Sequence, residues 1–140
     1  MENTALLMYN RYLNGIKSLI GNYTTTTTQL NRTGVQLFGK KYKGTHSAAI
    51  HMTVPRMLMQ FGDCCILNTS SKMPGEHWVA FARGKKQMYA YDSFGRHVSG
   101  LASDADMDAE QAILESNCGQ RCLAWLMVFN KHGEDVAKLI

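Results

Sequence analysis

The sequence predicts an α+β fold in which one buried helix packs on a small, mostly antiparallel sheet. Residues 118–129 are apolar on nearly all sides after the first turn, and such a helix is covered by other elements. Residues 77–82 and 87–91 are two apolar segments on either side of the turn 83–86, the pattern of a β-hairpin. The 140 residues, 45% of them hydrophobic, suit one domain with a single core.

The predicted buried helix carries a cysteine at its start. Asn117 is a favourable N-cap residue and Gly133 a typical helix stop, so Cys118 falls in the first turn. A thiol there lies at the positive end of the helix dipole, which favours the thiolate that attacks carbonyl groups. Cys122 follows one turn later and is expected to point into the core. The alternative is that Cys118 is a small buried core residue as well.

Hydrophobic spacing and turn residues give the other elements. Residues 4–20 are expected to form an amphipathic helix that ends at Gly21. Its apolar stripe is formed by Leu6, Tyr9, Leu13, Ile16 and Ile20. The further expectations are extended chain or a loop in the threonine run 23–28, a short strand at 35–38, a basic loop at 40–44, a helical turn at 55–61, a buried strand at 64–67, a polar loop at 68–75 and an acidic connector at 99–116.

Composition excludes several classes of protein. No apolar run approaches the roughly 20 residues that a membrane-spanning helix needs, and the first residues lack the basic region of a signal peptide. The four cysteines form neither a disulfide framework nor a zinc-binding pattern. We therefore expect reduced thiols in the cytoplasm or nucleus, no metal site and no membrane partner.

Positive charge is concentrated in the N-terminal half. Residues 1–60 contain seven Lys and Arg against one acid, whereas residues 61–140 contain eight against ten. This asymmetry suggests a polyanionic partner, and the alternative is an ordinary solvated surface. The candidate nucleic-acid-binding residues are Lys40, Lys41, Lys43, Arg83, Lys85 and Lys86.

The hairpin brings together two groups that a cysteine hydrolase needs. His77 opens the first strand and Asp92 follows the second, so both lie at the same end of the hairpin. An imidazole oriented by a carboxylate can take the proton of a thiol, here that of Cys118. The Gln111 side chain and the backbone N–H of Cys118 are candidate donors to the oxyanion. Gln120 is the competing side-chain donor, although its place in the second turn of the helix makes that role awkward.

These residues occur in an order that resembles a known family. The series His77-Trp78, then Asp92-Ser93-Phe94-Gly95, then Gln111, then Asn117-Cys118-Gly119-x-x-Cys122 is similar to the adenovirus proteases (adenain) and to the related Ulp-type SUMO proteases. The segment around His77 and the seven-residue step from Gln111 to Cys118 resemble adenain more than the Ulp-type enzymes. The resemblance covers roughly residues 62–130.

The resemblance implies a permuted papain-like fold over residues 1–140 and a cysteine endopeptidase that cleaves after small residues such as glycine. It also implies that Trp78 flanks the catalytic histidine, that Gly119 lines the site, and that Gln111 helps to bind the oxyanion. It implies viral precursor proteins as substrates, no cofactor, activation by DNA or a viral peptide, and a location in the host nucleus and virion. Residues 93–117 contain no cysteine that could link such a peptide by a disulfide.

Three other functions remain open from the sequence. A SUMO- or ubiquitin-type deconjugating enzyme would use the same chemistry, and acetyltransferases of the same fold keep the His, acid and Cys. An inactive module that binds nucleic acid is the alternative from a different class. The presence of His77, Asp92, Gln111 and Cys118 together favours an enzyme.

Overall fold

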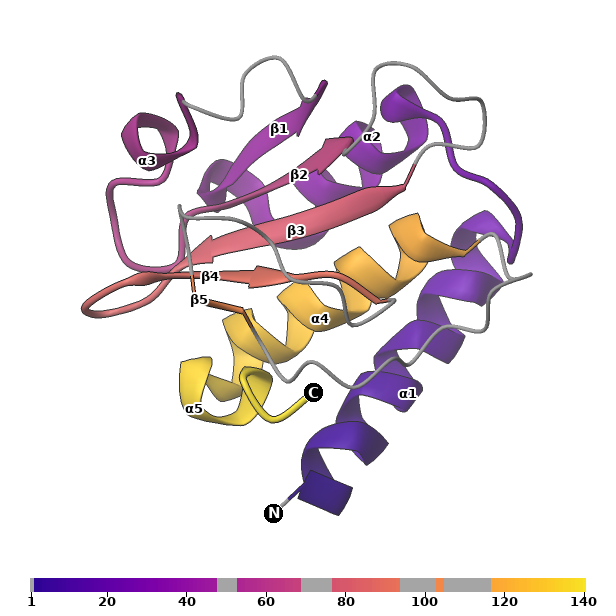
Figure 1. Cartoon of the computed structure of the whole chain (residues 1–140). Helices are drawn as coiled ribbons and strands as arrows, with labels where there is room; N and C mark the ends of the chain where they lie inside the picture. The colour runs from indigo at the N-terminus through magenta and orange to yellow at the C-terminus, as the bar shows by residue number, and fades with distance from the viewer. Residues whose placement is uncertain (1, 48–52, 69–76, 94–102, 105–116) are drawn as a thin grey trace.

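The computed structural model describes residues 2–47, 53–68, 77–93, 103–104 and 117–140, with the backbone alone for residues 2, 3, 103 and 104. These residues form an α+β fold, as predicted: one mixed sheet with helices packed against it (Figure 1). The elements are α1 (Glu2–Ile20), α2 (Thr27–Phe38), η1 (Gly39–Lys41), β1 (Tyr42–His46), α3 (Val54–Met57), β2 (Cys64–Asn68), β3 (Trp78–Arg83), β4 (Met88–Tyr91), β5 (Ser103–Asp104), α4 (Cys118–His132) and α5 (Glu134–Ala137).

The sheet has the strand order β1-β2-β3-β4-β5. The inner pairs, β2 with β3 and β3 with β4, are antiparallel, and the predicted hairpin is confirmed. The outer pairs, β1 with β2 and β4 with β5, are parallel. The expectation of a mostly antiparallel sheet is therefore wrong at both edges. A hairpin has a local turn signature, but parallel neighbours come from distant segments and leave no such signature in the sequence.

Helix α1 confirms the predicted N-terminal helix, with one change in its buried stripe. Ala5, Tyr9 and Leu13 are buried, whereas Leu6 is 42% exposed. The stripe therefore begins at Ala5 and not at Leu6, and it continues at four- and three-residue steps along one side of the helix. The helix ends at Gly21, which has a φ of +88° and donates its N–H to the carbonyl of Lys17.

Helix α2 replaces the short strand predicted at 35–38, and the extended chain or loop predicted for 23–28 is found only at 23–26 because the helix begins at Thr27. Thr26 and Gln29 form a capping box: Oγ1 of Thr26 accepts from the Gln29 N–H at 3.0 Å, and Oε1 of Gln29 accepts from the Thr26 N–H at 3.1 Å. Leu30 and Phe38 are buried while Val35 is 50% exposed, so the apolar spacing is helical. The expected basic loop at 40–44 is also wrong, because a 3₁₀ turn and strand β1 cover it.

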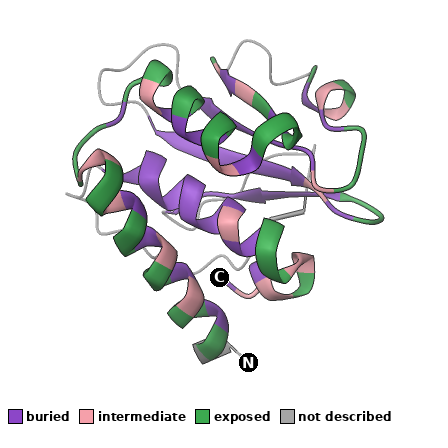
Figure 2. Ribbon diagram, turned by 180° about the vertical axis from the view of Figure 1, so that it is seen from behind, coloured by how far each residue is buried: buried purple, intermediate pink, exposed green. Residues whose placement is uncertain are grey.

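Both faces of the sheet are apolar. One face packs against α1, α2 and α4, through Ile66, Ala80 and Tyr91 among others, and the opposite face packs against Val54 and Leu58 of the α3 region. All residues of α4 from Cys118 to Phe129 except Met127 are buried, as predicted for a helix covered on most sides (Figure 2). Figure 2 also shows α4 lying between α1 and the sheet.

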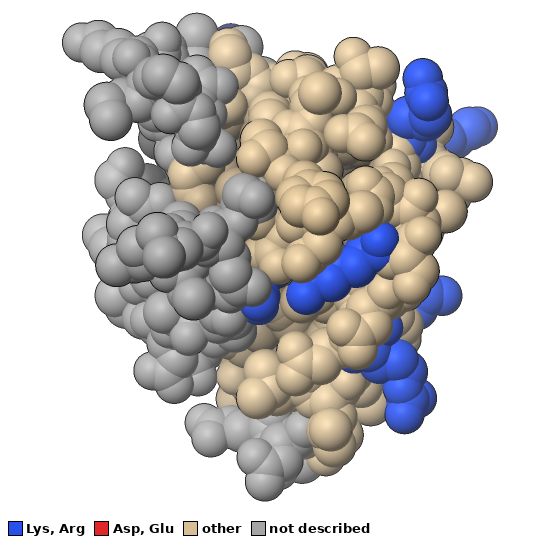
Figure 3. Space-filling view, turned by 90° about the vertical axis from the view of Figure 1, so that its right-hand side faces the viewer, with Lys and Arg blue, Asp and Glu red and all other residues tan. Residues whose placement is uncertain are grey.

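The two ends of the sheet differ in what they carry. At one end of the sheet, β1 and β2 begin, β3 ends and the β3–β4 turn follows. At the other end, β2 and β4 end and β3 begins. We call these the turn end and the His77 end. Figure 3 shows the side of the molecule at which β3 and α4 begin, where Lys and Arg are visible but no Asp or Glu among the described residues.

No helix in the described part of the chain is long and apolar enough to cross a membrane.

Candidate active site

His77 and Asp92 meet at the His77 end of the sheet. His77 directly precedes β3 and Asp92 directly follows β4, and the antiparallel pairing of these strands places the two side chains together. Nε2 of His77 lies 2.6 Å from Oδ1 of Asp92, and both residues are buried. The predicted proximity of these residues is confirmed. A hydrogen bond of this length to a carboxylate fixes the orientation of the imidazole ring.

The surroundings of His77 favour its protonated form. Burial by itself lowers the pKa of the imidazole, because a charge is less stable away from water. The hydrogen bond to Asp92, the neighbouring Cys118 and the charges on these two groups together raise it by more, so the pKa of His77 lies above its ordinary value of 6.5. The effect of Cys118 on the pKa of His77 indicates that the thiol lies near the ring. The three residues therefore lie close together, with the imidazole bonded to Asp92 and near Cys118.

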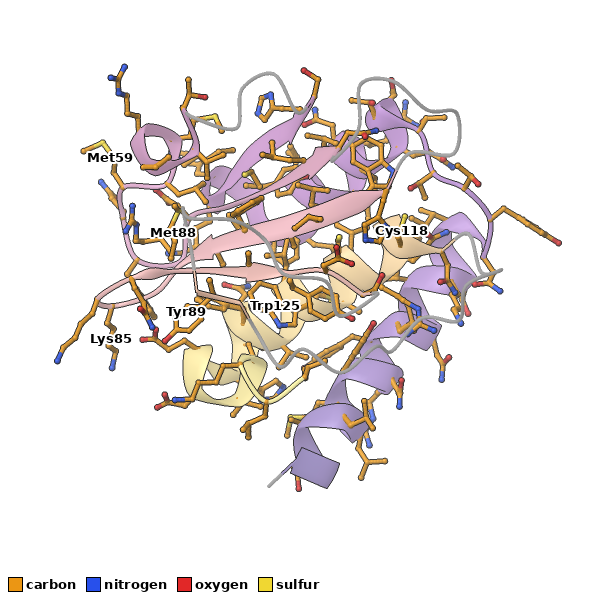
Figure 4. All side chains as sticks on the ribbon, in the orientation of Figure 1. Met59, Lys85, Met88, Tyr89, Cys118 and Trp125 are labelled. Atoms are coloured by element: carbon orange, nitrogen blue, oxygen red, sulfur yellow. The ribbon has the colours of Figure 1, made fainter. Side chains whose placement is uncertain are left out.

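Cys118 is the first residue of α4, as predicted. Figure 4 places its side chain at the beginning of the helix, on the side that faces the start of β3. Asn117 occupies the N-cap position, but its side chain does not cap the helix. Its Oδ1 accepts from Nε of Arg121 at 3.0 Å and its Nδ2 donates to Oδ1 of Asn22 at 2.9 Å. The predicted position of Asn117 is right, but its side chain is engaged away from the first-turn N–H groups near Cys118.

The other three cysteines have the properties of core thiols. Burial raises the pKa of Cys64 to about 12 and raises the pKa of Cys65 and of Cys122 as well. Cys122 lies one turn along α4 from Cys118 and is completely buried, as predicted. A thiol that remains protonated at neutral pH is a poor nucleophile, so these three cysteines are unsuited to catalysis.

The remaining predicted site residues have mixed outcomes. Gln111 lies outside the described residues. Trp78 is buried and belongs to the apolar cluster that also contains α4, so it packs against the helix that carries Cys118. A Cβ on Gly119 would lie 2.1 Å from Oγ1 of Thr25, so glycine is required there for close packing of the segment after α1.

Gln120, the competing oxyanion donor, is held by the segment that follows α1. Its Nε2 donates to the backbone carbonyls of Gly21 and Tyr23, each at 2.8 Å. The amide group therefore joins α4 to that segment and is directed away from the first turn of the helix. This contact gives a structural reason for the expectation that Gln120 does not bind the oxyanion.

The six basic candidates are separated from His77 by the length of the sheet. Lys40, Lys41, Lys43, Arg83, Lys85 and Lys86 all lie at or next to the turn end. Figure 4 shows Lys85 and Met59 pointing outward at this end, away from Cys118. A strand of five residues spans about 17 Å, so the basic residues at the turn end do not themselves contact the candidate active site.

Part of this basic group has structural contacts. Nε of Arg83 donates to the carbonyl of Leu58 at 2.5 Å, and Nζ of Lys41 donates to the carbonyl of Phe61 at 3.0 Å. Arg83 is only partly exposed, which makes it the weakest of the six candidates for contact with nucleic acid. All five lysines of the group are exposed, and Nζ of Lys43 lies 4.0 Å from Oδ1 of Asp63.

Sequence reasoning missed a buried polar network beside Cys118 and Asp92. Tyr9 of α1 was assigned only to an apolar stripe, but its hydroxyl contacts both Tyr91 and Arg121. The only available signal was Arg121 itself, a charged residue within a helix that is otherwise apolar on all sides. A buried arginine needs hydrogen-bonding partners, but the sequence does not identify them.

The described residues contain no cluster of three or more His, Cys, Asp or Glu side chains that could hold a metal ion.

None of the known families, curated proteins and solved structures with which the chain was compared matches it. Any function assigned to the site therefore depends on the geometry of its own residues and on the short motifs that resemble adenain.

Proposed function

We propose that this chain is a cysteine endopeptidase with His77, Asp92 and Cys118 as its catalytic residues. The observation that carries the proposal is the position of His77, whose ring binds Asp92 at 2.6 Å and lies near enough to Cys118, at the start of α4, for that group to raise the pKa of the imidazole. His77 and Asp92 flank the β3–β4 hairpin, whereas Cys118 begins α4, which is distant from the hairpin in sequence. A thiol, an imidazole and a carboxylate in this order form the arrangement that activates a cysteine nucleophile.

The reaction would proceed as two acyl transfers. Because Nε2 of His77 is bound to Asp92, Nδ1 is the atom that exchanges a proton with Cys118. The thiolate attacks the carbonyl carbon of the scissile peptide, and the C–N bond then breaks as the imidazolium gives its proton to the leaving amine. Water, deprotonated by the same imidazole, attacks the resulting thioester; the C–S bond breaks, releasing the acid and restoring the thiol.

The start of α4 is suited to stabilise the oxyanion. Backbone N–H groups in the first turn of a helix point toward its N-terminal end, and the helix dipole favours negative charge there. The Asn117 side chain does not cap these groups, since it binds Asn22 and Arg121. The Cys118 N–H is the proposed first donor, and the Gln111 amide, by resemblance to adenain, is the proposed second.

The substrate assignment rests on the resemblance. We propose polypeptides cleaved after a small residue such as glycine, with viral precursor proteins as the physiological class. DNA is proposed as an activator that binds at the turn end, where the exposed lysines gather. A SUMO- or ubiquitin-type deconjugating activity would use the same residues, and a library of peptide and isopeptide substrates distinguishes the two.

The test is cleavage of that library by the natural chain, by Cys118→Ala and by the matched variant Cys64→Ala. Cys118→Ala should abolish cleavage while the protein remains folded, because only the nucleophile is removed. Cys64→Ala also removes a thiol from a buried position but leaves the site intact, so it should retain activity. Cleavage by Cys118→Ala at the natural rate would refute the proposed mechanism.

A further inference from the structure

The residues directly before the acid and the nucleophile of the candidate site, Tyr91 and Asn117, are joined beneath the surface by a chain of hydrogen bonds. Tyr9 of α1 is completely buried, and its hydroxyl oxygen lies 2.7 Å from that of Tyr91, the residue directly before Asp92. The two rings meet edge to face, with an interplanar angle of 82°. Tyr9 therefore contacts the end of β4 at the point where the strand delivers the carboxylate.

The same hydroxyl also contacts α4. Nη1 of Arg121 donates to the Tyr9 oxygen at 3.2 Å, and Nε of Arg121 donates to Oδ1 of Asn117 at 3.0 Å. Asn117 is the residue directly before Cys118. Arg121 is 7% exposed, so its fork of N–H groups makes these bonds away from bulk water. One guanidinium thus holds the start of the nucleophile's helix on one side and Tyr9 on the other.

We propose that Tyr9, Tyr91, Asn117 and Arg121 form a buried strut that sets the position of Asp92 relative to Cys118, with Tyr9 and Arg121 as positioning residues. The proposal rests on the proposed endopeptidase function and gives α1 a part in it. No member of the strut needs to touch the substrate.

The places of Asp92 and Cys118 at the ends of their elements favour a positioning role for the strut. Asp92 follows the last residue of a strand and Cys118 begins a helix, and element ends are the places where backbone moves most readily. A core of apolar side chains would need neither the hydrogen bond between the two tyrosines nor those made by the arginine. Burying an arginine also costs free energy. The planar guanidinium fixes the direction of both of its bonds, and the Tyr9 oxygen that accepts from it can donate its own proton to Tyr91. The chain of bonds therefore transmits position from α4 to the end of β4.

A second tyrosine of α1 supplies a matched control. The Tyr12 hydroxyl lies 2.7 Å from Nε2 of His132, so it also joins α1 to α4. His132 is the last residue of α4, at the opposite end of the helix from Cys118. Tyr9→Phe and Tyr12→Phe each remove one oxygen atom and one contact between the same two helices. Only Tyr9→Phe interrupts the strut.

The experiment compares the two variants by peptide cleavage and by NMR titration of His77, after thermal unfolding has shown that both are folded. Tyr9→Phe should lower kcat by about 10- to 100-fold with little change in KM, because the reacting groups are misplaced by a fraction of an ångström to one ångström. It should also lower the pKa of His77 toward 6.5, because the hydrogen bond to Asp92 that helps to raise it is loosened. Tyr12→Phe should change neither quantity.

Equal effects of Tyr9→Phe and Tyr12→Phe on kcat and on the His77 titration would overturn the strut. If the natural chain cleaves no peptide, the endopeptidase proposal fails, but the NMR titration still decides whether Tyr9 positions Asp92 on His77. Should Tyr9→Phe not fold, Arg121→Lys replaces it. The lysine keeps the charge but cannot bond to Asn117 and Tyr9 with one rigid fork, so the same two changes are expected, and their absence would overturn the strut.

Discussion

Replacing Asp92 by asparagine is the most direct perturbation of the candidate site. The substitution preserves the size of the side chain and removes its charge, so the 2.6 Å bond to Nε2 of His77 becomes a neutral contact or is lost. An amide can also turn its NH₂ group toward the ring, which would favour the wrong tautomer of His77. We expect Asp92→Asn to reduce peptide cleavage more than it reduces folding stability.

The size of the effect follows from the bond that is removed. Both residues are 8% exposed, so the bond is a buried hydrogen bond to a charged group, which contributes about 1.5–3 kcal/mol. If that contribution is fully lost in the transition state, kcat falls roughly 10- to 150-fold. The equivalent change in serine hydrolases lowers kcat by about 10⁴. A smaller loss is expected here because a thiol depends less than a hydroxyl on the base and its partner.

The same substitution should change how stability depends on pH. The pKa of His77 in the folded protein lies above 6.5, so the stabilisation that its protonation provides is fully present below about pH 6.5. That stabilisation is lost as the pH rises through the folded-state pKa. Because the neutral amide of the variant no longer holds the proton on His77, the free energy of unfolding of Asp92→Asn should vary less with pH in this window.

Asp63→Asn is the matched control for these measurements. Asp63 is equally buried, at 6% exposed, but it lies at the turn end, where its Oδ2 accepts from the N–H of Gln60 at 3.0 Å. Steady-state kinetics and urea unfolding between pH 5 and 8 would be measured for both variants. Asp63→Asn should reduce stability and leave kcat unchanged. Natural activity in Asp92→Asn would remove Asp92 from the site and refute the reasoning.

Three further predictions depend on particular contacts. Iodoacetamide should label Cys118 before the other cysteines, whose pKa values are raised by burial; faster labelling of any other cysteine, seen by mass spectrometry, would contradict the choice of nucleophile. Gly119→Ala should lower the free energy of unfolding by about 1–3 kcal/mol because its Cβ meets Thr25 at 2.1 Å, and adding Thr25→Ala should restore much of the loss in urea unfolding. Duplex DNA should bind without sequence preference and weaken roughly 500-fold per tenfold increase in salt if the exposed Lys40, Lys85 and Lys86 contact three phosphates. Fluorescence anisotropy would measure this slope, and unchanged binding after all three are replaced by Glu, with Lys138→Glu as control, would place the DNA elsewhere.

The hairpin and the buried helix could be predicted because each has a local signature. Alternation around a turn fixes which ends of two strands are adjacent, so the contact between His77 and Asp92 followed from the sequence alone. Continuous apolar character likewise identified α4, and the N-cap position of Asn117 placed Cys118 in its first turn. These signals depend on neighbours within about 15 residues.

The features that were missed depend on tertiary structure. Threonine is a poor helix former, so the run 23–28 suggested extended chain or a loop, but from Thr27 onward the capping box at Thr26 and the burial of Leu30 outweigh that preference. The contact between Tyr9 and Tyr91 joins residues 82 positions apart, and no periodicity reports such a pairing. Burial was predicted correctly for Tyr9, but its hydrogen bonds could not be.

The distance between the basic turn end and Cys118 limits how DNA could activate the enzyme. Helix α4 has 15 residues and is about 22 Å long, with Cys118 at one end and His132 at the other. DNA held by the turn-end lysines could alter the site by moving such an element, or it could act by bringing the enzyme to substrates that also bind DNA. A short uncharged peptide substrate does not bind DNA, so co-localisation on DNA cannot speed its cleavage. Its rate of cleavage with and without DNA therefore separates the two routes. A rate increase with that peptide would require a conformational effect, whereas an increase confined to DNA-binding substrates would indicate co-localisation on the DNA.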